Sequence, residues 1–247
     1  MIEDSSQHGL MTILAADTST SINSVAVCRG GQLVAEVVVE SRRLHSERLI
    51  GVVDWLLAEA GLSLDQIEVL AVSHGPGSFT GLRIGVATWK GLAFGLKRPL
   101  VGVPTLDALS RAGVFENAVV CAVLDARMHE VFAAAYLFEQ GRRTKIVPDA
   151  VCPIEVFLGQ PQLQGRPLVF LGDGARNYED RIRARCPQAV FAASHCAVPR
   201  AAAVAAEALD LLEQGGPSEA ALVSPIYLRQ SQAEQDRERA LAGASPL

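Results

Sequence analysis

Residues 74–85 read HGPGSFTGLRIG, a glycine-dense stretch between an apolar run at 67–73 and a long helical pattern at 80–96. This order predicts a strand, a tight turn and a helix. Glycine lets the backbone approach a ligand closely, and the first N–H groups of a helix lack partners within the helix. The stretch therefore predicts either a phosphate cradle at the start of the helix or a turn in which the glycines serve the fold alone.

The spacing of these glycines differs from the standard nucleotide-binding patterns. Gly75, Gly77 and Gly81 give G-x-G-x-x-x-G, which is one residue longer than the dinucleotide pattern, and G-x-x-x-x-G-K-[ST] does not occur in the sequence. Asp17 follows the first predicted strand, where an aspartate is either a metal or phosphate residue or a turn former. Asp17, Gly75 and Gly77 are thus the candidates for cofactor binding, although no cofactor is expected.

Composition is typical of a soluble globular protein. The chain has 247 residues, 49% of them hydrophobic, and no apolar run approaches the ~18–20 residues of a membrane span. Five scattered cysteines without a C-x-x-C pair favour a reducing compartment, so a cytoplasmic location is expected. The net charge of −5 argues against a protein that binds nucleic acid by itself. The polar residues 1–10 and 230–247 are expected to be disordered tails.

The first part of the chain predicts one α/β lobe over residues 11–100. A buried strand at 12–16 precedes a hairpin, because RGGQ at 29–32 is a turn between two apolar runs. A helix with apolar side chains at helical spacing follows at 46–60 and ends at Gly61. The strand, turn and helix around the glycine stretch complete this lobe.

Residues 101–229 repeat this plan in a reduced second lobe. The first of its strands ends at Asp125, and a helix at 199–213 and a last strand at 222–228 complete it. That first strand is expected at 119–124, and two further strands are expected at 131–138 and 168–171. Two duplicated α/β lobes with aspartates at strand ends are the plan of the actin, hexokinase and Hsp70 ATPase superfamily, whose lobes are ribonuclease H-like.

Five motifs together resemble the TsaB (YeaZ) family over nearly the whole chain, from residue 11 to residue 229. They are DTST at 17–20, HSERL at 45–49, GPGSFTGLRIG at 75–85, DAR at 125–127 and PIYLR at 225–229. The resemblance implies a non-catalytic subunit of the bacterial machinery that makes threonylcarbamoyladenosine in tRNA, at the adenosine beside the anticodon. It also implies a catalytic paralogue, TsaD, as partner, an ATPase, TsaE, that the pair engages, and contact with tRNA only through the complex.

A comparison with the paralogue's metal site supports a non-catalytic role. The paralogue holds its metal through H-x-x-x-H at a helix start, where two imidazoles one turn apart face one ion. The comparable segment here is GVPTLDAL at 102–109, with Thr105 and Leu109 at the histidine positions. Neither side chain can replace an imidazole ligand. We therefore expect no metal site and no catalytic residue.

Two other functions compete with this one. An ATP-dependent small-molecule kinase of the same superfamily is the main alternative, and the missing ligands and the reduced second lobe argue against it. A peptidase needs a nucleophile with a base, or a zinc site. The sequence has no H-E-x-x-H, and Ser78 lacks the flanking glycines of G-x-S-x-G.

The two tryptophans of the chain predict a partner surface. In the helix at 46–60, Trp55 lies opposite the apolar stripe, beside charged residues. The helix at 80–96 is apolar on a bulky side and on a narrow, glycine-rich side, and one of these packs on its own sheet. We expect these two helices to bind the paralogue, and a second copy of the chain when the paralogue is absent. The alternative is that Trp55 folds over a loop and both apolar sides pack internally. The interface candidates are Trp55, Arg48, Gly85, Thr88, Trp89 and Leu92.

Overall fold

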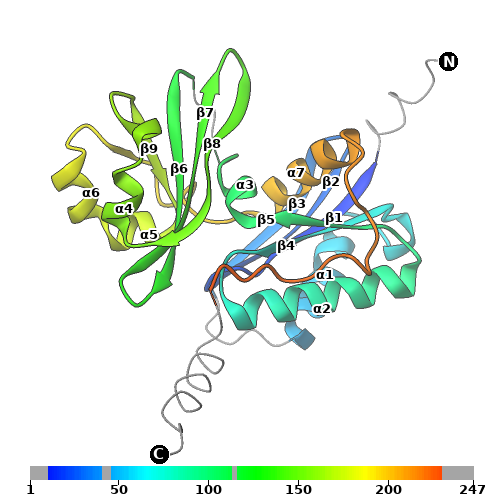
Figure 1. Ribbon diagram of the computed structural model, residues 1–247. Coiled ribbons are helices and arrows are strands. Elements are labelled where there is room, and N and C mark those ends of the chain that lie inside the picture. Colours follow the sequence, from blue (N-terminus) through cyan, green and yellow to red (C-terminus); the bar gives the residue numbers. More distant parts are fainter. Residues whose placement is uncertain (1–10, 41–45, 113–115, 230–247) are drawn as a thin grey trace, which may run out of the picture.

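The computed structural model describes residues 11–40, 46–112 and 116–229, which form two α/β lobes (Figure 1). The predicted tails at 1–10 and 230–247 lie outside the described residues. The first lobe has five strands, β1 (Thr12–Asp17), β2 (Ile22–Arg29), β3 (Gln32–Glu40), β4 (Val69–Gly75) and β5 (Leu100–Pro104). Their order in the sheet is β3-β2-β1-β4-β5. Strands β1, β2 and β3 are antiparallel neighbours, whereas β1, β4 and β5 run parallel.

The second sheet repeats this topology. Its strands are β6 (Ala118–Arg127), β7 (Glu130–Glu139), β8 (Arg142–Cys152), β9 (Leu168–Leu171) and β10 (Val190–Phe191). Their order is β8-β7-β6-β9-β10, again with an antiparallel meander followed by two parallel strands. The duplicated α/β plan that the sequence predicts is therefore confirmed.

Helices cover both faces of the first sheet. On one face lie α1 (Ser46–Glu59) and α2 (Phe79–Leu96), and on the other lies α7 (Ala201–Glu213) (Figure 1). The helix expected at 199–213 is thus present, but its placement in the second lobe was wrong. Buried alanines on α7 pack against β1, β2, β4 and β5, which lie far away in the sequence.

Shorter helices complete the second lobe and the junction. The helices α4 (Ile154–Leu158), α5 (Asp173–Asn177) and α6 (Glu179–Arg185) cover one face of the second sheet, with 3-10 turns at Leu64–Gln66 (η2) in the first lobe and Pro161–Leu163 (η3) in the second. The helix α3 (Thr105–Leu109) packs Leu106 and Leu109 against the other face. In the described part of the chain, no helix has the length and apolar character needed to cross a membrane.

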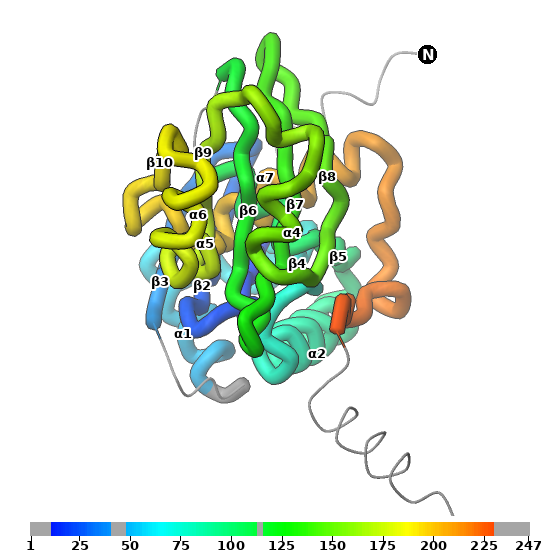
Figure 2. The backbone as a smooth tube through the Cα atoms, turned by 60° about the vertical axis from the view of Figure 1, so that its left-hand side comes forward, coloured from blue at the N-terminus to red at the C-terminus, as the bar shows by residue number. Residues whose placement is uncertain are grey.

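The strand expected at 222–228 is absent, and the segment has no regular secondary structure. It leaves α7 and descends along the first lobe to end beside α2 (Figure 2). The backbone N–H of Leu100 donates to Ser218 O at 3.0 Å, and that of Ile226 donates to His74 O at 2.6 Å. The first lobe therefore includes both β5, which extends beyond the expected boundary at residue 100, and the segment that follows α7.

Candidate functional site

The glycine stretch joins β4 to α2, as the sequence predicts. Ser78 is the N-cap of α2, and its Oγ accepts a hydrogen bond from the N–H of Gly81 at 3.3 Å. The N–H of Ser78 donates to Ser19 O at 2.6 Å. The turn therefore directs its hydrogen-bonding groups at the loop after β1, a part of the protein itself.

The glycines of this stretch are needed because other backbone lies against them. A Cβ on Gly77 would lie 2.5 Å from Ser19 O, and a Cβ on Gly81 or Gly85 would overlap Thr18. The hydroxyl of Thr18 donates to Gly81 O at 2.8 Å, which holds the loop on the helix. The space in which a phosphate would approach the glycines is filled by the residues that follow β1.

Gly75 completes this packing from the other side. Its φ is +125°, a conformation that favours glycine, and a Cβ there would overlap Ile226 O in the segment after α7. The ring of Tyr227 lies 4.8 Å from that of Phe79, and the Arg83 guanidinium stands 3.9 Å above the Phe79 ring. The Nε of Arg83 donates to Tyr227 Oη at 3.0 Å. Two motifs of the resemblance, at 75–85 and 225–229, thus pack directly on each other.

Asp17 is fully buried at the end of β1. Its carboxylate accepts hydrogen bonds from the hydroxyl of Ser73 on β4, and from the N–H and hydroxyl of Ser19 at 2.9 and 2.7 Å. Burial raises the pKa of Asp17, and the hydrogen bonds lower it to a smaller extent. Asp17 and Gly75 end the neighbouring parallel strands β1 and β4, and Gly77 follows β4, but each of the three contacts other groups of the protein.

The second lobe has a similar arrangement at the end of β6. The Asp125 carboxylate accepts from the N–H of Arg127 at 2.8 Å and from Asn177 Nδ2 at 3.1 Å. Asp173 Oδ1 accepts from the N–H groups of Asp125 and Gly174, and burial raises the pKa of Asp173. These aspartates therefore fix the strand ends and the neighbouring turn.

The two positions compared with the paralogue's histidines lie in the interior. Thr105 is buried, and its Oγ1 has no hydrogen-bond partner among the described residues. Leu109 is part of the core that joins α3 to the second sheet. Within residues 11–40, 46–112 and 116–229, no three His, Cys, Asp or Glu side chains lie together in a way that could hold a metal ion.

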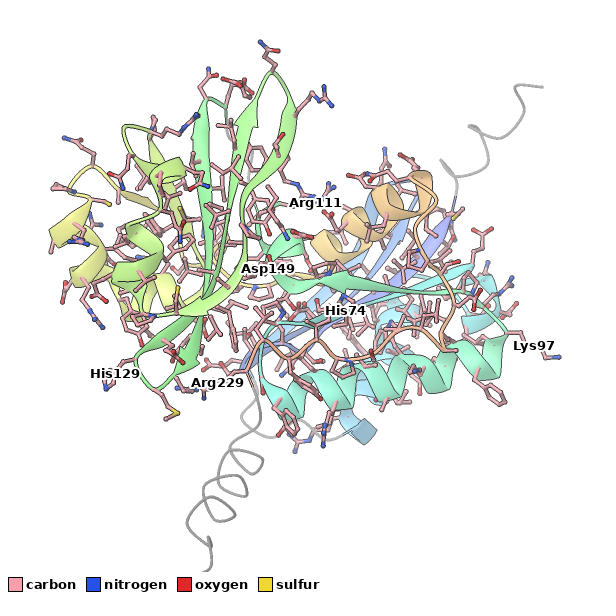
Figure 3. The ribbon with its side chains drawn as sticks, viewed as in Figure 1. His74, Lys97, Arg111, His129, Asp149 and Arg229 are labelled. Carbon is pink, nitrogen blue, oxygen red and sulfur yellow. The ribbon has the colours of Figure 1, made fainter. Side chains whose placement is uncertain are left out.

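Ion pairs lie at the junction of the lobes. Glu207 on α7 is buried and accepts two hydrogen bonds from Arg143 of β8, both at 2.7 Å, and it also pairs with Arg111 (Figure 3). Asp107 on α3 pairs with Lys145 of β8 at 2.6 Å. These contacts hold α3 and α7 against the second sheet.

The outer face of α1 and α2 exposes two large aromatic side chains. Trp55 is 56% exposed, as predicted, and Phe94 is 87% exposed. The sequence reasoning missed Phe94, although its spacing from Ala87 and Gly91 places all three on one outer line of α2. A Cβ on Gly91 would have open space around it.

Two of the interface candidates were wrong. Trp89 is fully buried, and its indole N–H donates to Leu14 O at 3.2 Å, because the bulky side of α2 packs on the first sheet. Gly85 faces Thr18. Of the other candidates, Arg48 is exposed, whereas Thr88 and Leu92 are partly buried.

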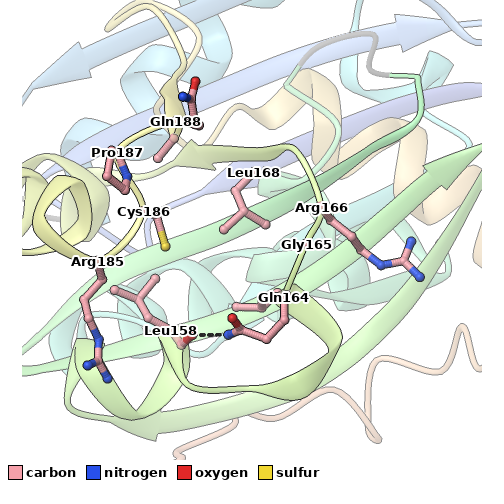
Figure 4. Close-up of a pocket in the computed structure, with 11 residues that line it drawn as sticks. Leu158, Gln164, Gly165, Arg166, Leu168, Arg185, Cys186, Pro187 and Gln188 are labelled. Carbon is pink, nitrogen blue, oxygen red and sulfur yellow. Dashed lines mark hydrogen bonds between the residues drawn. The ribbon is translucent and has the colours of Figure 1, made fainter.

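A pocket of about 200 Å³ lies elsewhere, on the second lobe (Figure 4). Its walls include Leu158 and Leu168, and the thiol of Cys186 points toward its centre. None of the cofactor-binding or interface candidates predicted from the sequence lines this pocket.

Comparison with known proteins gives consistent results. The family model described as "TsaD: tRNA N6-adenosine threonylcarbamoyltransferase" matches residues 32–237. The tRNA threonylcarbamoyladenosine biosynthesis protein TsaB of Bacillus subtilis is 31% identical over 172 residues, which cover 70% of this chain and 75% of that protein. The protein of the same name from Haemophilus influenzae is 35% identical over 162 residues, which cover 62% of this chain and 68% of that protein.

The structure of YeaZ from Pseudomonas aeruginosa superposes with a TM-score of 0.76 at 35% identity. The match covers 89% of this chain and all of that one. The chain therefore belongs to the TsaB (YeaZ) family.

Proposed function

We propose that this protein is a non-catalytic subunit in the synthesis of threonylcarbamoyladenosine in tRNA. In this role it binds and supports a catalytic, TsaD-like paralogue, which transfers the threonylcarbamoyl group to the adenosine beside the anticodon. A TsaE-like ATPase works with the pair, and tRNA is contacted through the complex. The setting is the cytoplasm. Membership of the TsaB family and the match to the TsaD family model support this proposal.

The observation that carries the proposal is the outer face of α1 and α2. Trp55 and Phe94 are exposed there, although large aromatic side chains gain about 2–3 kcal/mol or more from burial. Gly51 on α1 and Gly91 and Gly95 on α2 have open space at the Cβ position, so the packing of this chain does not require them. Exposed aromatic anchors beside small residues suit the close approach of a partner's helices.

The non-catalytic part of the proposal rests on the positions at which relatives of this fold would bind phosphate or metal. Thr18 and Ser19 occupy the space beside the glycines of the turn. The Asp17 carboxylate accepts a hydrogen bond from Ser73 inside the lobe. Thr105 and Leu109 stand in the core. The residues that would serve phosphate or metal chemistry in this superfamily therefore stabilise the first lobe and its contact with α3.

Co-purification and an activity assay test the function. We expect the chain to form a stable complex with the TsaD-like protein of the same cell, and we expect tRNA modification by that protein to require the chain. Trp55→Ala should reduce both complex formation and modification, whereas Val156→Ala, at an exposed position on α4, should change neither. Full modification in the absence of the chain would refute the proposal.

A second measurement separates this role from that of a small-molecule kinase. We expect the isolated protein to bind no stoichiometric transition metal and to release no phosphate from ATP. Elemental analysis and a phosphate-release assay check this. Steady hydrolysis of ATP by the isolated chain would favour the kinase instead.

A further inference from the structure

The pocket on the second lobe is built by four segments outside the candidate site (Figure 4). They are the end of α4, the chain between η3 and β9, the end of α6 and the approach to β10. The volume of the pocket is about 200 Å³. A protein cavity of about 150 Å³ holds a benzene molecule, so this pocket has room for an aromatic ring with a short substituent.

The inner wall of the pocket is apolar. Leu158, Leu163 and Leu168 are buried members of the core of the second lobe, and Ala189 belongs to the same core. Gln164 Nε2 donates to Leu158 O at 3.1 Å, which holds the chain after η3 against the end of α4. Core side chains thus face an open space whose wall is fixed by a hydrogen bond. Such a wall favours a ligand with an apolar body.

The charged side chains at the pocket are all positive. Arg166 and Arg185 stand on opposite sides of it, and no Asp or Glu is among the described residues that line it (Figure 4). Neither guanidinium forms an ion pair within residues 11–40, 46–112 and 116–229. By contrast, Arg181 on the same helix as Arg185 pairs with Glu155 at 2.5 Å. The two arginines at the pocket are therefore left to attract a negative charge from outside the chain.

The charge of Arg185 acts on the interior of the pocket. The thiol of Cys186 points toward the centre of the space (Figure 4). Burial raises the pKa of this thiol, and the Arg185 charge lowers it to a smaller extent. Because a protonated thiol is a poor nucleophile, Cys186 serves as a part of the wall and not as a reactive group.

We propose that this pocket binds a small organic anion. Its apolar body lies against the leucines of the inner wall, and its carboxylate pairs with Arg185, while Arg166 adds positive potential from the opposite side. A neutral molecule of the same shape leaves both arginines unpaired, and a cation meets two like charges. The pocket shares no residue with the outer face of α1 and α2, and the inference does not depend on the proposed function.

A matched pair of probes tests the charge of the ligand. Phenylacetate and phenylacetamide have the same shape and the same number of non-hydrogen atoms, but only phenylacetate is charged. Each is titrated into the full chain and followed by NMR spectroscopy of the probe. A ligand of this size reaches a dissociation constant on the order of 1 mM in a suitable pocket. We expect phenylacetate to bind in this range and phenylacetamide to bind at least about tenfold more weakly.

Alkylation of the cysteines tests where the probe binds. Cys186 is partly buried, as are Cys152 and Cys196, which do not line the pocket and serve as internal controls. Iodoacetamide labels the thiols, and mass spectrometry of the peptides gives the rate at each one. With phenylacetate at about three times its dissociation constant, the rate at Cys186 should fall about fourfold, because about three quarters of the chains are occupied. The rates at Cys152 and Cys196 should not change.

Two substitutions test the walls. Arg185→Gln removes the paired charge, and we expect it to raise the dissociation constant of phenylacetate about tenfold. The matched control is Arg142→Gln, because Arg142 is an exposed arginine of β8 with no ion pair in the described part of the chain. The control should bind as the wild type does. Cys186→Phe fills the space with a ring and should abolish binding.

Four results would overturn the proposal. They are equal binding of phenylacetate and phenylacetamide, unchanged affinity of Arg185→Gln, equal protection of Cys186, Cys152 and Cys196, and no protection of Cys186 at about 10 mM phenylacetate. Thermal melts check that each variant is folded. The alkylation of the wild type needs no substitution, so it decides the matter if Cys186→Phe does not fold.

Discussion

The two faces of the α2 helix use the same residue types for opposite purposes. On the inner face, Gly81 and Gly85 let the helix touch Thr18, and Trp89 fills the core with its indole N–H bonded to Leu14 O. On the outer face, Gly91 has open space around it and Phe94 is 87% exposed. A glycine in a helix costs about 1 kcal/mol relative to alanine. The inner glycines are explained by packing within the chain, whereas no packing contact of the chain requires the outer ones.

The largest effect is expected from the inner face. Gly81→Ala should lower the free energy of unfolding by about 3 kcal/mol, because the new Cβ would overlap backbone at Thr18, which cannot move aside as a side chain can. Urea denaturation followed by circular dichroism measures this. A variant as stable as the wild type would show that the inner glycine is not required by packing.

The next effect concerns binding at the outer face. Trp55→Ala should weaken complex formation with the paralogue at least about tenfold, since truncation of an aromatic anchor often costs about 2 kcal/mol or more. The melting temperature of the isolated chain should hardly change, because Trp55 is 56% exposed. Calorimetric titration checks the affinity. Unchanged affinity, or an unfolded variant, would mean that the interface lies elsewhere.

A pH effect tests the loop against which the inner glycines pack. Burial raises the pKa of Asp17 in the folded protein, so its protonated form favours folding. The raised pKa makes its full contribution to the free energy of unfolding at pH values below the ordinary pKa of an aspartate. That contribution is lost as pH rises through the raised pKa of Asp17. The stability of the wild type relative to Asp17→Asn should therefore fall with rising pH, by at most about 1.4 kcal/mol per pH unit. Urea unfolding of both proteins from about pH 4 to pH 8 measures the difference, and a constant difference would contradict the assignment.

The smallest expected effect is a gain in the free energy of unfolding, opposite in sign to the loss expected for Gly81→Ala. Gly91→Ala should raise the stability of the isolated chain by about 0.8 kcal/mol, because alanine favours the helix and its Cβ meets nothing. The same change should weaken binding of the paralogue if a partner backbone lies close to Gly91. Urea denaturation of this variant gives the change in the free energy of unfolding, and calorimetric titration gives the change in affinity for the paralogue. Stabilisation with unchanged affinity would leave the outer glycine without a role in the interface.

Local patterns in the sequence predicted most of the elements. The strand before the glycine stretch and the helix after it correspond to β4 and α2, with bounds that differ by one or two residues at most. The RGGQ turn joins β2 to β3, with Gly30 and Gly31 at positive φ as such a turn requires. Trp55 could be placed on the outer face because helical spacing fixes which side chains share a side.

Contacts between distant segments could not be predicted in this way. The pattern of α7 shows that it is a helix, but nothing local shows that its alanines pack on the first sheet and not on the second. The segment at 222–228 has the composition of a strand, yet it packs as irregular chain against Gly75. The two apolar sides of α2 were equally good candidates for the core, and only the packing on β1 decided that Trp89 is inside.

The sequence by itself therefore determined most of the elements of the first lobe, the duplication and the family, because these depend on the spacing of residues along the chain. The tertiary structure alone decided what the glycines and Asp17 do. A glycine turn before a helix fits a phosphate and a protein backbone equally well, since both need the absence of a Cβ. Which of them fills the space depends on the loop after β1, more than fifty residues earlier in the chain, and here Thr18 and Ser19 fill it.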